Sequence, residues 1–337
     1  MTGEHGRDGD STYVPGATSD GVRGLATDRV AHQRGGELRR NPVNGKLAIV
    51  APSRATRPGD AGRDRAAAPA CPFCPGNEAL TPPEVDALRP DGGVADGPGW
   101  RVRVVPNKYP ALEGRHEVIA HAPAHEAELE DLADEALADV LGMWRRRIAA
   151  QLEGGAAAVM LIGNLGAGSG ASLEHPHEQL FATPVVPSLL LDELLEAERH
   201  RNRYGSCVLC DQLGAAGDRL VLGGDVVAWV PDASRFNGEL WLAPAAHEAD
   251  FRAADVGALA PALRRALVAV KTAIAGAPLN FWLHTAPADL RGPFHWHLEL
   301  APRTAVIAGF ELGSDIALVT KDPAAAAAEY RAALPPA

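Results

Sequence analysis

Apolar residues follow two periods along this chain, and the longest helical pattern lies between residues 126 and 148. Large apolar side chains recur there every three or four positions, at Leu129, Leu132, Leu137, Val140, Leu141, Trp144 and Ile148. Acidic residues gather at the start of this stretch, and three arginines at 145–147 occur near its end. Both features suit a helix dipole, so the stretch predicts an amphipathic helix.

Shorter apolar segments bounded by glycine, proline and polar residues predict strands. We expect them at residues 47–50, 101–105, 117–120, 157–162, 226–230, 240–243, 279–284 and 294–300. A further strand is expected to carry His175 and His177 and to continue through 180–182. Helices are predicted at 188–201, 255–274 and 323–334, the second broken or bent near Gly257 and Pro261. Residues 1–35 predict a disordered tail, and 55–70 predict a loop.

The order of these segments occurs twice, which predicts an internal duplication. Each copy has a Cys-x-x-Cys pair, strands, a short proline-to-histidine element, a long helix, a strand and a His-x-His sequence. We therefore predict an α+β fold of two similar halves, each an antiparallel sheet with packed helices. The predicted divisions are a tail at 1–35, an N-terminal domain at 36–190 and a C-terminal domain at 191–337.

The composition narrows the class of protein. The 337 residues carry a formal net charge of -11 and are 46% hydrophobic. The acidic balance argues against a broad nucleic-acid surface. No apolar run approaches the length of a membrane span, and residues 1–24 lack the apolar segment of a secretory signal. We expect a cytoplasmic protein that binds neither nucleic acid nor a membrane.

The four cysteines form two Cys-x-x-Cys pairs. In a cytoplasmic protein such pairs are typical of metal ligands or redox centres, and neither pair lies in a clear thioredoxin-like pattern. Histidines follow each pair at similar intervals, and zinc prefers four tetrahedral Cys and His ligands. The sequence predicts two zinc sites, whose ligands are Cys71, Cys74, His125 and His175 in the first half, and Cys207, Cys210, His247 and His295 in the second.

A second interpretation exists for the metal site of the C-terminal half. It uses a ligand set without cysteine, formed by Glu193, His284, His295 and His297. A strand-end position explains His284 more simply, and a solvated helix position explains Glu193. The set is therefore the weaker alternative, but the sequence does not exclude it.

The segment EHPHEQ at residues 174–179 carries the candidate chemistry. In an extended segment His175, His177 and Gln179 share one face. With His175 committed to zinc, His177 is the candidate nucleophile toward phosphorus, its tautomer fixed by a backbone carbonyl at the other ring nitrogen. Gln179 can donate to a phosphoryl oxygen as charge develops. The preceding glycine-rich run at 163–172 lets backbone N–H groups approach phosphate, with Asn164, Gly170 and Ser172 as further contacts.

Several short sequences occur in the order found in one enzyme family. They are NPVNG at 41–45, PSRATRP at 52–58, CPFCPGN at 71–77, VPNKYPAL at 105–112, HPHEQ at 175–179, FHWHLE at 294–299 and GFE at 309–311. Through them, most of residues 40–312 resembles the galactose-1-phosphate uridylyltransferase branch of the histidine triad superfamily. The resemblance implies two histidine-triad-like halves, a homodimer, and nucleotidyl transfer between a nucleotide sugar and a sugar 1-phosphate through a covalent His177 intermediate.

The family pattern also implies roles for individual residues. The nucleotide and its α-phosphate would be contacted by Asn107, Asn164, Gly170, Ser172 and Gln179. Arg54 and Arg57 would contact the acceptor phosphate, which suits guanidinium geometry, although the sequence alone favours a solvated loop for both. Glu311 would bind sugar hydroxyls.

The resemblance favours a hexose-1-phosphate uridylyltransferase of galactose metabolism that moves UMP. Leu173, Glu174 and Ala305 depart from the residues that family members have at these positions, which leaves the sugar phosphate open. The second Cys-x-x-Cys pair is more typical of members resembling ADP-glucose phosphorylases, which transfer adenylyl to phosphate, and this gives an alternative. A zinc-stabilised nucleotide-binding protein without turnover is the remaining alternative, and the presence of both His177 and Gln179 argues against it.

Overall fold

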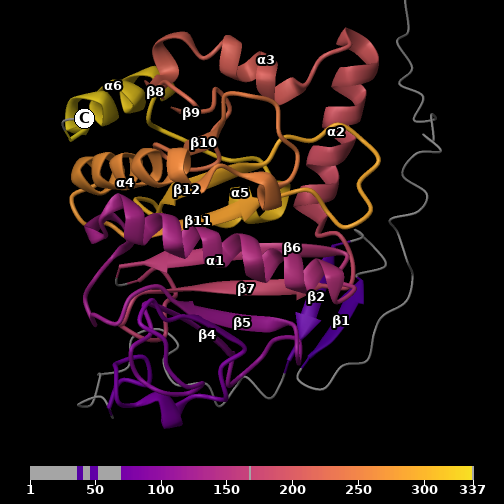
Figure 1. Cartoon of the computed structure of the whole chain (residues 1–337). Coiled ribbons are helices and arrows are strands. Elements are labelled where there is room, and N and C mark those ends of the chain that lie inside the picture. Colours follow the sequence, from indigo (N-terminus) through magenta and orange to yellow (C-terminus); the bar gives the residue numbers. More distant parts are fainter. Residues whose placement is uncertain (1–35, 41–45, 52–69, 167, 336–337) are drawn as a thin grey trace, which may run out of the picture.

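The computed structural model describes residues 36–40, 46–51, 70–166 and 168–335. Its centre is one ten-stranded antiparallel sheet in the order β3-β4-β5-β7-β6-β11-β12-β10-β9-β8 (Figure 1). We call β3 to β7 the N-terminal half of this sheet and β8 to β12 the C-terminal half. The halves join where β6 pairs with β11. Counting outward from this pair, β7 corresponds to β12, β5 to β10, β4 to β9 and β3 to β8.

The strands of the large sheet are short, and most are buried. Their bounds are β3 Asp86–Leu88, β4 Val102–Pro106, β5 His116–Ala120, β6 Ala158–Leu165, β7 His177–Thr183, β8 Leu220–Leu222, β9 Val226–Trp229, β10 Leu240–Pro244, β11 Leu279–His284 and β12 His297–Pro302. A separate hairpin pairs β1 Glu37–Arg40 with β2 Leu47–Val50.

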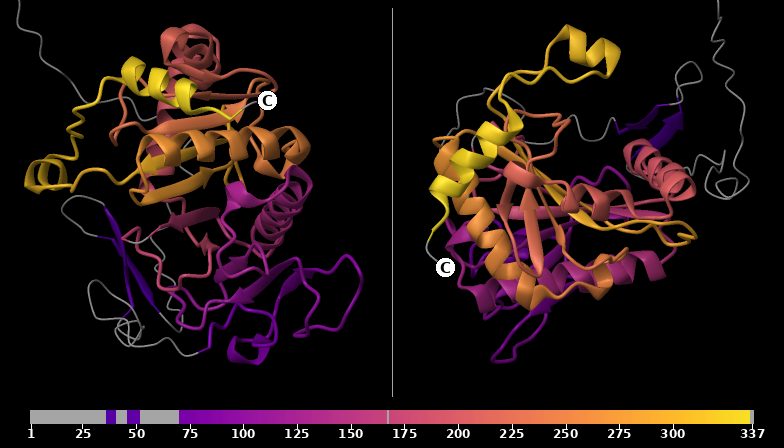
Figure 2. Two further views of the ribbon diagram at one scale, coloured as in Figure 1. Left: turned by 90° about the vertical axis from the view of Figure 1, so that its left-hand side faces the viewer. Right: turned by 90° about the horizontal axis from the view of Figure 1, so that it is seen from above.

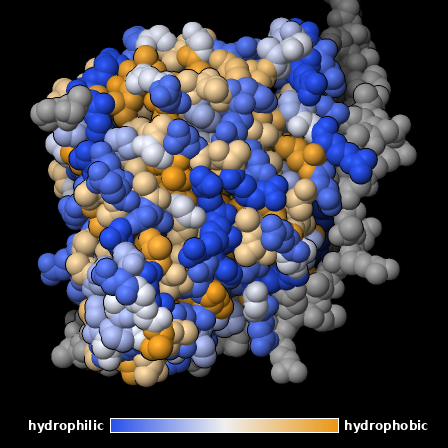
Figure 3. Space-filling model, in the orientation of Figure 1, coloured by the Kyte–Doolittle hydropathy of each residue, from blue (hydrophilic) through white to orange (hydrophobic). Residues whose placement is uncertain are grey.

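The helices cover the two faces of the large sheet unequally. Their bounds are α1 Asp134–Glu153, α2 Ser188–Tyr204, α3 Val208–Gly214, α4 Val256–Ala273, α5 Gly309–Ser314 and α6 Pro323–Ala333. The long helices α1 and α4 pack against each other on one face, and α6 packs beside α4. Helix α2 lies on the opposite face (Figure 2). Polar and apolar side chains are interspersed over the outer surface of α1 and α4 (Figure 3).

The main core lies between the sheet and the α1/α4 layer, and it is continuous across the two halves. Trp144 of α1 stacks on Phe281 of β11, with 5.8 Å between ring centroids. Gly163 of β6 is the register partner of Phe281, and a Cβ at position 163 would lie 1.9 Å from Cε1 of that ring. Glycine at this position therefore lets the two halves join in one sheet.

The predicted duplicated α+β fold with antiparallel strands is confirmed. The helix predicted at 255–274 as broken or bent is not broken, since α4 is one continuous helix with Pro261 inside it. Asp255 caps this helix by accepting from the N–H groups of Gly257 and Ala258, at 2.9 and 3.1 Å. Because Pro261 lies so close to this end, it removes only a hydrogen bond of the early turns.

Two further predicted bounds need correction. The strand expected at 294–300 begins only at His297, because the N–H of Trp296 bonds to Glu248 O instead of joining the sheet. The helical pattern that starts at residue 126 divides into a 3-10 turn, Leu129–Asp131, and the helix α1. The short elements β1, β3, β8, α3 and α5 were not predicted.

The predicted tail at 1–35 and the loop expected at 55–70, apart from its last residue, lie outside the described residues. In the part of the chain that the structure describes, none of the helices combines the length and the apolar character that crossing a membrane requires.

Candidate active site and metal centres

The candidate nucleophile His177 is the first residue of β7, and a backbone carbonyl fixes its tautomer as predicted. Its Nδ1 donates to the carbonyl oxygen of His175 at 2.9 Å, so the lone pair is on Nε2. The side chain is buried, and its ring centroid lies 5.4 Å from that of Phe73. His177 lines a cavity of about 210 Å³, together with Glu128, Asn164, Gly166, Ala171, Leu173, Glu174 and Pro176.

The loop between β6 and β7 forms one wall of this cavity. Gly170 in this loop has φ +97°, a conformation that L side chains rarely adopt, so glycine is required there. Ala171 and Leu173 line the cavity, and the predicted contacts Gly170 and Ser172 are the residues that alternate with them along the same loop. Neither predicted contact is among the described residues that line the cavity.

Asn164 of β6 is held by a side chain from the other half of the sheet. Asn280 of β11 donates through Nδ2 to Asn164 Oδ1 at 2.7 Å and to Ser169 O at 2.9 Å. Arg303 donates in turn to Asn280 Oδ1 at 3.0 Å. Because its oxygen is engaged, Asn164 presents its NH₂ group as a donor. Asn280 was not predicted as a site residue, since only the β6–β11 register brings it beside Asn164.

Gln179 lies two residues after His177 on β7 and is nearly buried. Its Oε1 lies 3.0 Å from Nε2 of His116, a residue of β5 that the sequence did not single out. Asn107 follows β4, and its Nδ2 lies 3.2 Å from the same His116 nitrogen. The predicted residues Asn107, Asn164, His177 and Gln179 therefore lie on one face of the N-terminal half, with Asn164 at the end where His177 lies and Asn107 linked to Gln179 through His116. The sequence signal for His116 was its position directly before the strand predicted at 117–120.

The residue between His177 and Gln179 is part of a buried ion pair. Glu178 accepts from Nδ1 of His121 at 2.7 Å, and both side chains are fully buried. The other His121 nitrogen, Nε2, donates to Ala127 O at 2.8 Å. Burial opposes the charged form of His121, but the Glu178 carboxylate outweighs it and raises the pKa of this imidazole. The pair ties β7 to the segment that carries His125.

The first predicted metal set is assembled by the fold. Its four ligand atoms, from Cys71, Cys74, His125 and His175, lie within 4.8 Å of one another. Cys74 Sγ is 3.3 Å from Nδ1 of His125, and Cys71 Sγ is 3.7 Å from Nδ1 of His175. A tetrahedral zinc ion with ordinary bond lengths needs sulfur-to-nitrogen separations of roughly 3.6 Å, so the set fits that ion.

The protonation state of His175 also suits a metal. Its Nε2 donates to Ala122 O at 2.8 Å, which leaves the lone pair on the Nδ1 that faces the thiols. Burial lowers the pKa of His175 to about 4, so the ring is neutral at pH 7. Burial, together with the neighbouring Cys71 thiol, raises the pKa of Cys74, so a thiolate there requires a bound cation.

The second predicted metal set repeats this arrangement in the C-terminal half. The ligand atoms of Cys207, Cys210, His247 and His295 also lie within 4.8 Å of one another. Cys210 Sγ is 3.5 Å from Nδ1 of His295 and 3.6 Å from Nδ1 of His247. Nε2 of His295 donates to Pro244 O at 3.0 Å, the counterpart of the bond made by His175.

The alternative set without cysteine is not formed with His295. Glu299 takes that place beside Glu193, His284 and His297, and one ligand atom from each lies within 4.8 Å of the others. Nδ1 of His284 lies 2.9 Å from Glu193 and 3.3 Å from Glu299 Oε1. The duplication explains the change, because His295 has the position of His175 and goes with its own cysteine pair.

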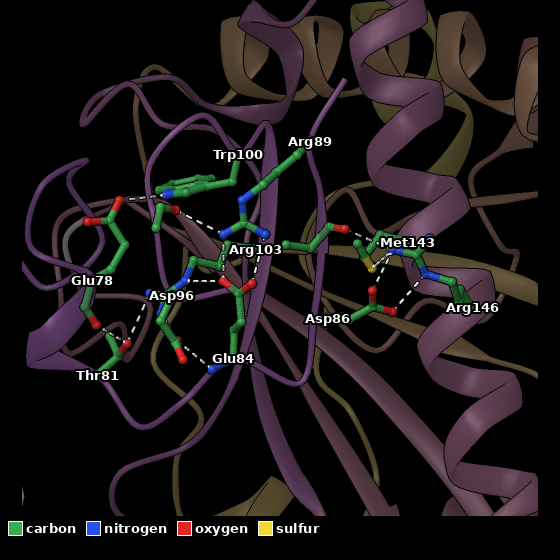
Figure 4. A network of polar contacts seen from close by, with 12 residues as sticks. Glu78, Thr81, Glu84, Asp86, Arg89, Asp96, Trp100, Arg103, Met143 and Arg146 are labelled. Atoms are coloured by element: carbon green, nitrogen blue, oxygen red, sulfur yellow. Dashed lines mark hydrogen bonds and ion pairs between the residues drawn. The ribbon is translucent and has the colours of Figure 1, made fainter. Parts of the chain in front are cut away.

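A polar network holds the loop after the first cysteine pair against the sheet (Figure 4). Glu78 accepts from the N–H of Gly76 at 2.9 Å and from Nε1 of Trp100 at 3.1 Å. Arg103 of β4 is almost fully buried and pairs with Glu84 at 2.9 Å. Trp100 also belongs to the apolar cluster that contains Phe73. The network therefore helps to hold the Phe73 ring, which lies beside His177.

Three predicted contacts remain, and none of them belongs to the set of described residues that line the cavity. Arg54 and Arg57 lie outside the described residues. Glu311 is on α5, where its carboxylate accepts from Ala308 N at 3.2 Å. Figure 2 shows α5 standing away from the sheet, and Glu311 is not among the described residues that line the cavity.

Comparisons with known proteins agree with this geometry. The sequence profile described as the galactose-1-phosphate uridyl transferase N-terminal domain matches residues 107–187. ADP-glucose phosphorylase of Arabidopsis thaliana is 29% identical over 317 residues, which cover 82% of this chain and 87% of that protein. Galactose-1-phosphate uridylyltransferase of Streptomyces lividans is 29% identical over 196 residues, which cover 56% of this chain and 50% of that protein.

Solved structures resemble both halves of the chain. A crystal structure of the ADP-glucose phosphorylase from Arabidopsis thaliana with bound ADP-glucose has a TM-score of 0.73 and 27% identity, covering 88% of this chain and 98% of that one. A uridylyltransferase structure has a TM-score of 0.74 and 26% identity over the same shares. Fold and site thus define a nucleotidyltransferase built from two histidine-triad-like halves. The chain is similar to members of the galactose-1-phosphate uridylyltransferase family in sequence and in fold, as its motifs predicted.

Proposed function

We propose that the chain transfers a nucleoside monophosphate from a nucleotide sugar through a covalent intermediate on Nε2 of His177. The hydrogen bond from Nδ1 to His175 O carries this proposal, because it leaves the lone pair on the nitrogen that attacks. The cavity that His177 lines supplies the place for the phosphoryl group. Burial of the ring limits competition from water.

The reaction has two displacements at the same phosphorus atom. Nε2 of His177 forms a bond to the α-phosphorus while the bond to the bridging oxygen breaks, and the sugar 1-phosphate leaves with the electron pair. An oxygen of the acceptor phosphate then forms its bond to phosphorus, and the bond to Nε2 breaks. In this proposal the NH₂ groups of Gln179 and Asn164 stabilise the charge that develops on the phosphoryl oxygens.

The nucleotide we favour is an ADP-sugar, with inorganic phosphate as the acceptor. The relative described as an ADP-glucose phosphorylase matches through both halves, whereas the Streptomyces lividans uridylyltransferase matches over about half of each chain. The second Cys/His set, which the structure assembles, also supports this choice. The products would then be ADP and the sugar 1-phosphate.

Uridylyl transfer to a hexose 1-phosphate is the second candidate. The profile match at 107–187 favours it, and a uridylyltransferase structure aligns as closely as the phosphorylase does. Leu173 and Glu174, which depart from the family pattern, both line the cavity. They are therefore positioned to alter the choice of sugar or acceptor.

The test uses ADP-glucose and UDP-glucose, each labelled at the α-phosphate. After brief incubation and denaturation, acid-labile label on the protein is expected from ADP-glucose. Chasing with inorganic phosphate should release the label as ADP. Label from UDP-glucose alone would select the second candidate, and label from neither nucleotide sugar would contradict the covalent mechanism.

We further propose that both Cys/His sets hold zinc and have a structural role. Each set offers four ligands with no position left for a substrate, as structural zinc sites do. Metal analysis of the purified protein by mass spectrometry should find two zinc ions per chain. A value near zero in protein purified without chelator would contradict this assignment.

A homodimer is proposed from the segment at 303–322, which joins β12 to α6 and includes α5. Large apolar side chains on it are exposed, including Val306 at 91%, Leu312 at 77% and Leu318 at 61%. Such a surface is typical of an interface. A second copy could then supply Glu311 to the sugar.

Replacing Val306 and Leu312 by serine should convert the dimer to a monomer in light scattering; an unchanged mass would place the interface elsewhere.

A further inference from the structure

A buried histidine on β5 lies beside two of the amide side chains at the candidate site. His116 is 2% exposed, and its ring stacks on Phe181 with 3.9 Å between centroids. Its Nε2 lies 3.0 Å from Gln179 Oε1 and 3.2 Å from Asn107 Nδ2. The two displacements described above assign no task to this ring.

Backbone donors decide which atoms of this group can donate. The N–H of Ala111 donates to Nδ1 of His116 at 3.1 Å, so Nδ1 is an acceptor and the neutral ring carries its hydrogen on Nε2. In a charged ring Nδ1 would also carry a hydrogen, so two donors, Nδ1–H and the Ala111 N–H, would face each other without an acceptor. Among the described residues, Gln179 Oε1 lies 3.0 Å from Nε2 and can accept its hydrogen, which makes His116 the donor in this bond.

The same reasoning fixes the amide of Asn107. Its Oδ1 accepts from the N–H of Tyr109 at 2.8 Å, so its Nδ2 is a donor. This Nδ2 cannot bond to the Nε2–H of His116, and its hydrogens are left for another acceptor. Asn107 and Gln179 thus both have their oxygens engaged, and both offer NH₂ groups.

The orientation of the Gln179 amide has a chemical consequence. Oxygen and nitrogen of a glutamine are nearly the same size, so a hydrogen-bond partner decides which of them faces the substrate. With the oxygen toward a phosphoryl group, Gln179 would repel the charge that it is required to stabilise. The donor on His116 makes this flipped orientation unfavourable, because it would bring two N–H groups together.

We propose that His116 is a positioning residue for nucleotidyl transfer, whose Nε2–H holds the Gln179 amide with its NH₂ group toward the phosphoryl oxygens. The inference rests on the proposed function of His177 and Gln179. The other half offers a contrast at the equivalent positions. Val118 is the register partner of Gln179, and Trp241 is the register partner of Glu299. His116 lies two residues before Val118, and Glu239 lies two residues before Trp241, so His116 and Glu239 have equivalent positions in the two halves. An ionised Glu239 has no proton to donate, in contrast to His116.

The test measures single-turnover formation of the acid-labile nucleotidyl protein. His116→Phe keeps a ring against Phe181 but removes the donor, and we expect labelling to slow by about 10- to 100-fold. His116→Gln places an amide NH₂ near the position of Nε2 and should recover to within about fivefold of the wild-type rate. His116→Met is the matched control for the glutamine variant, with similar length and no donor. Thermal unfolding and metal content establish that each variant is folded.

A double-mutant cycle separates positioning from general damage to the site. If His116 acts through Gln179, His116→Phe should change the rate by less than about twofold in a Gln179→Ala background. Two results would overturn the role of His116 while leaving the proposed function intact. The first is that His116→Phe slows labelling equally with and without Gln179→Ala. The second is that folded His116→Gln labels as slowly as His116→Met. A wild-type protein that forms no labelled intermediate would overturn the proposed function and this inference with it.

Discussion

The two halves of the sheet share a scaffold but differ around their second histidines. His177 and His297 both begin a strand, and both donate from Nδ1 to the carbonyl two residues earlier, at 2.9 and 3.0 Å. Trp241 stacks on His297 with 4.6 Å between centroids, whereas the smaller Val118 has the equivalent place in the N-terminal half. The same backbone thus gives a ring that lines a cavity in one half and a ring covered by an indole in the other.

The polar neighbours of the two histidines also differ in charge. The position of Gln179 is Glu299 in the C-terminal half, where Arg235 and two histidines surround a buried carboxylate. Burial opposes the ionised form of Glu299, but the hydrogen bond from His297 and the nearby His284 and Arg235 outweigh it and lower the pKa of this carboxyl. A fixed negative charge there would repel a phosphoryl group. The comparison teaches that a few side chains, and not the backbone, confine the proposed chemistry to one half.

Removing each histidine should give the largest contrast. His177→Gly is expected to abolish acid-labile labelling and to lower turnover by about 10⁴-fold or more, because the attacking atom is lost. His297→Gln should label at a rate within about fivefold of the wild type, since His297 does not line the cavity. Both variants are compared by labelling and by metal content. Loss of metal from His177→Gly would mean that His175 and His177 exchange their assigned roles.

Exchanging the neighbouring polar residue should have the next largest effect. Gln179→Glu gives the N-terminal half the carboxylate of the other half, and turnover should fall by about 10²- to 10³-fold because a donor is replaced by a negative charge. Glu299→Gln is the reciprocal change, and it should alter stability without creating a second labelled site. Stoichiometry of label per chain measures both outcomes; two labels on the Glu299 variant would contradict the division of roles.

Losing a metal ligand should affect activity unequally in the two halves. Cys71→Ser is expected to lower zinc content by one ion and turnover by about 10²-fold, because the His175 carbonyl that orients His177 would shift. Cys207→Ser should also lose one ion and some thermal stability, with the turnover of the folded protein nearly unchanged. Equal losses of turnover in both variants would show that the second metal set also supports the active site.

The smallest effect concerns the pH dependence of stability. Burial and the neighbouring Glu299 raise the pKa of Glu239 to about 7, above its ordinary value of 4.5. Between these two values the folded protein binds more protons than the unfolded chain, so this carboxyl lowers stability as pH rises from 4.5 to about 7. Glu239→Gln should reduce the loss of stability between pH 5 and pH 8 by about 1–3 kcal/mol. Urea unfolding of the wild-type and Glu239→Gln proteins at both pH values measures the free energy of unfolding. The same loss of stability between pH 5 and pH 8 in both proteins would contradict the prediction.

The two Cys/His sets could be predicted, and the candidate nucleophile could be proposed, because their sequence signal is local. Cysteine pairs two residues apart and His-x-His sequences are visible without the fold, and their repetition predicted which histidines belong with which cysteines. The structure assembles both sets as predicted. The departure of Glu299 from glutamine was visible in the same way, and it led us to propose the chemistry for the first half.

His116, Asn280 and Trp241 could not be assigned from the sequence. Each is an ordinary residue of a short strand until strand pairing brings it beside Gln179, Asn164 or His297. Register is set by packing of the whole sheet, including the contact that Gly163 allows with Phe281, and not by any local pattern.

The sequence by itself therefore determined the duplicated α+β fold, the resemblance to the family, the two sets of Cys and His residues and the candidate nucleophile. Short motifs carry this information because ligand type and spacing are properties of the chain. Only the tertiary structure decided which nitrogen of His177 keeps its lone pair, which ring covers His297 and what holds the Gln179 amide. Those properties depend on hydrogen bonds and contacts between residues far apart in the chain, which exist only when ten strands share one register.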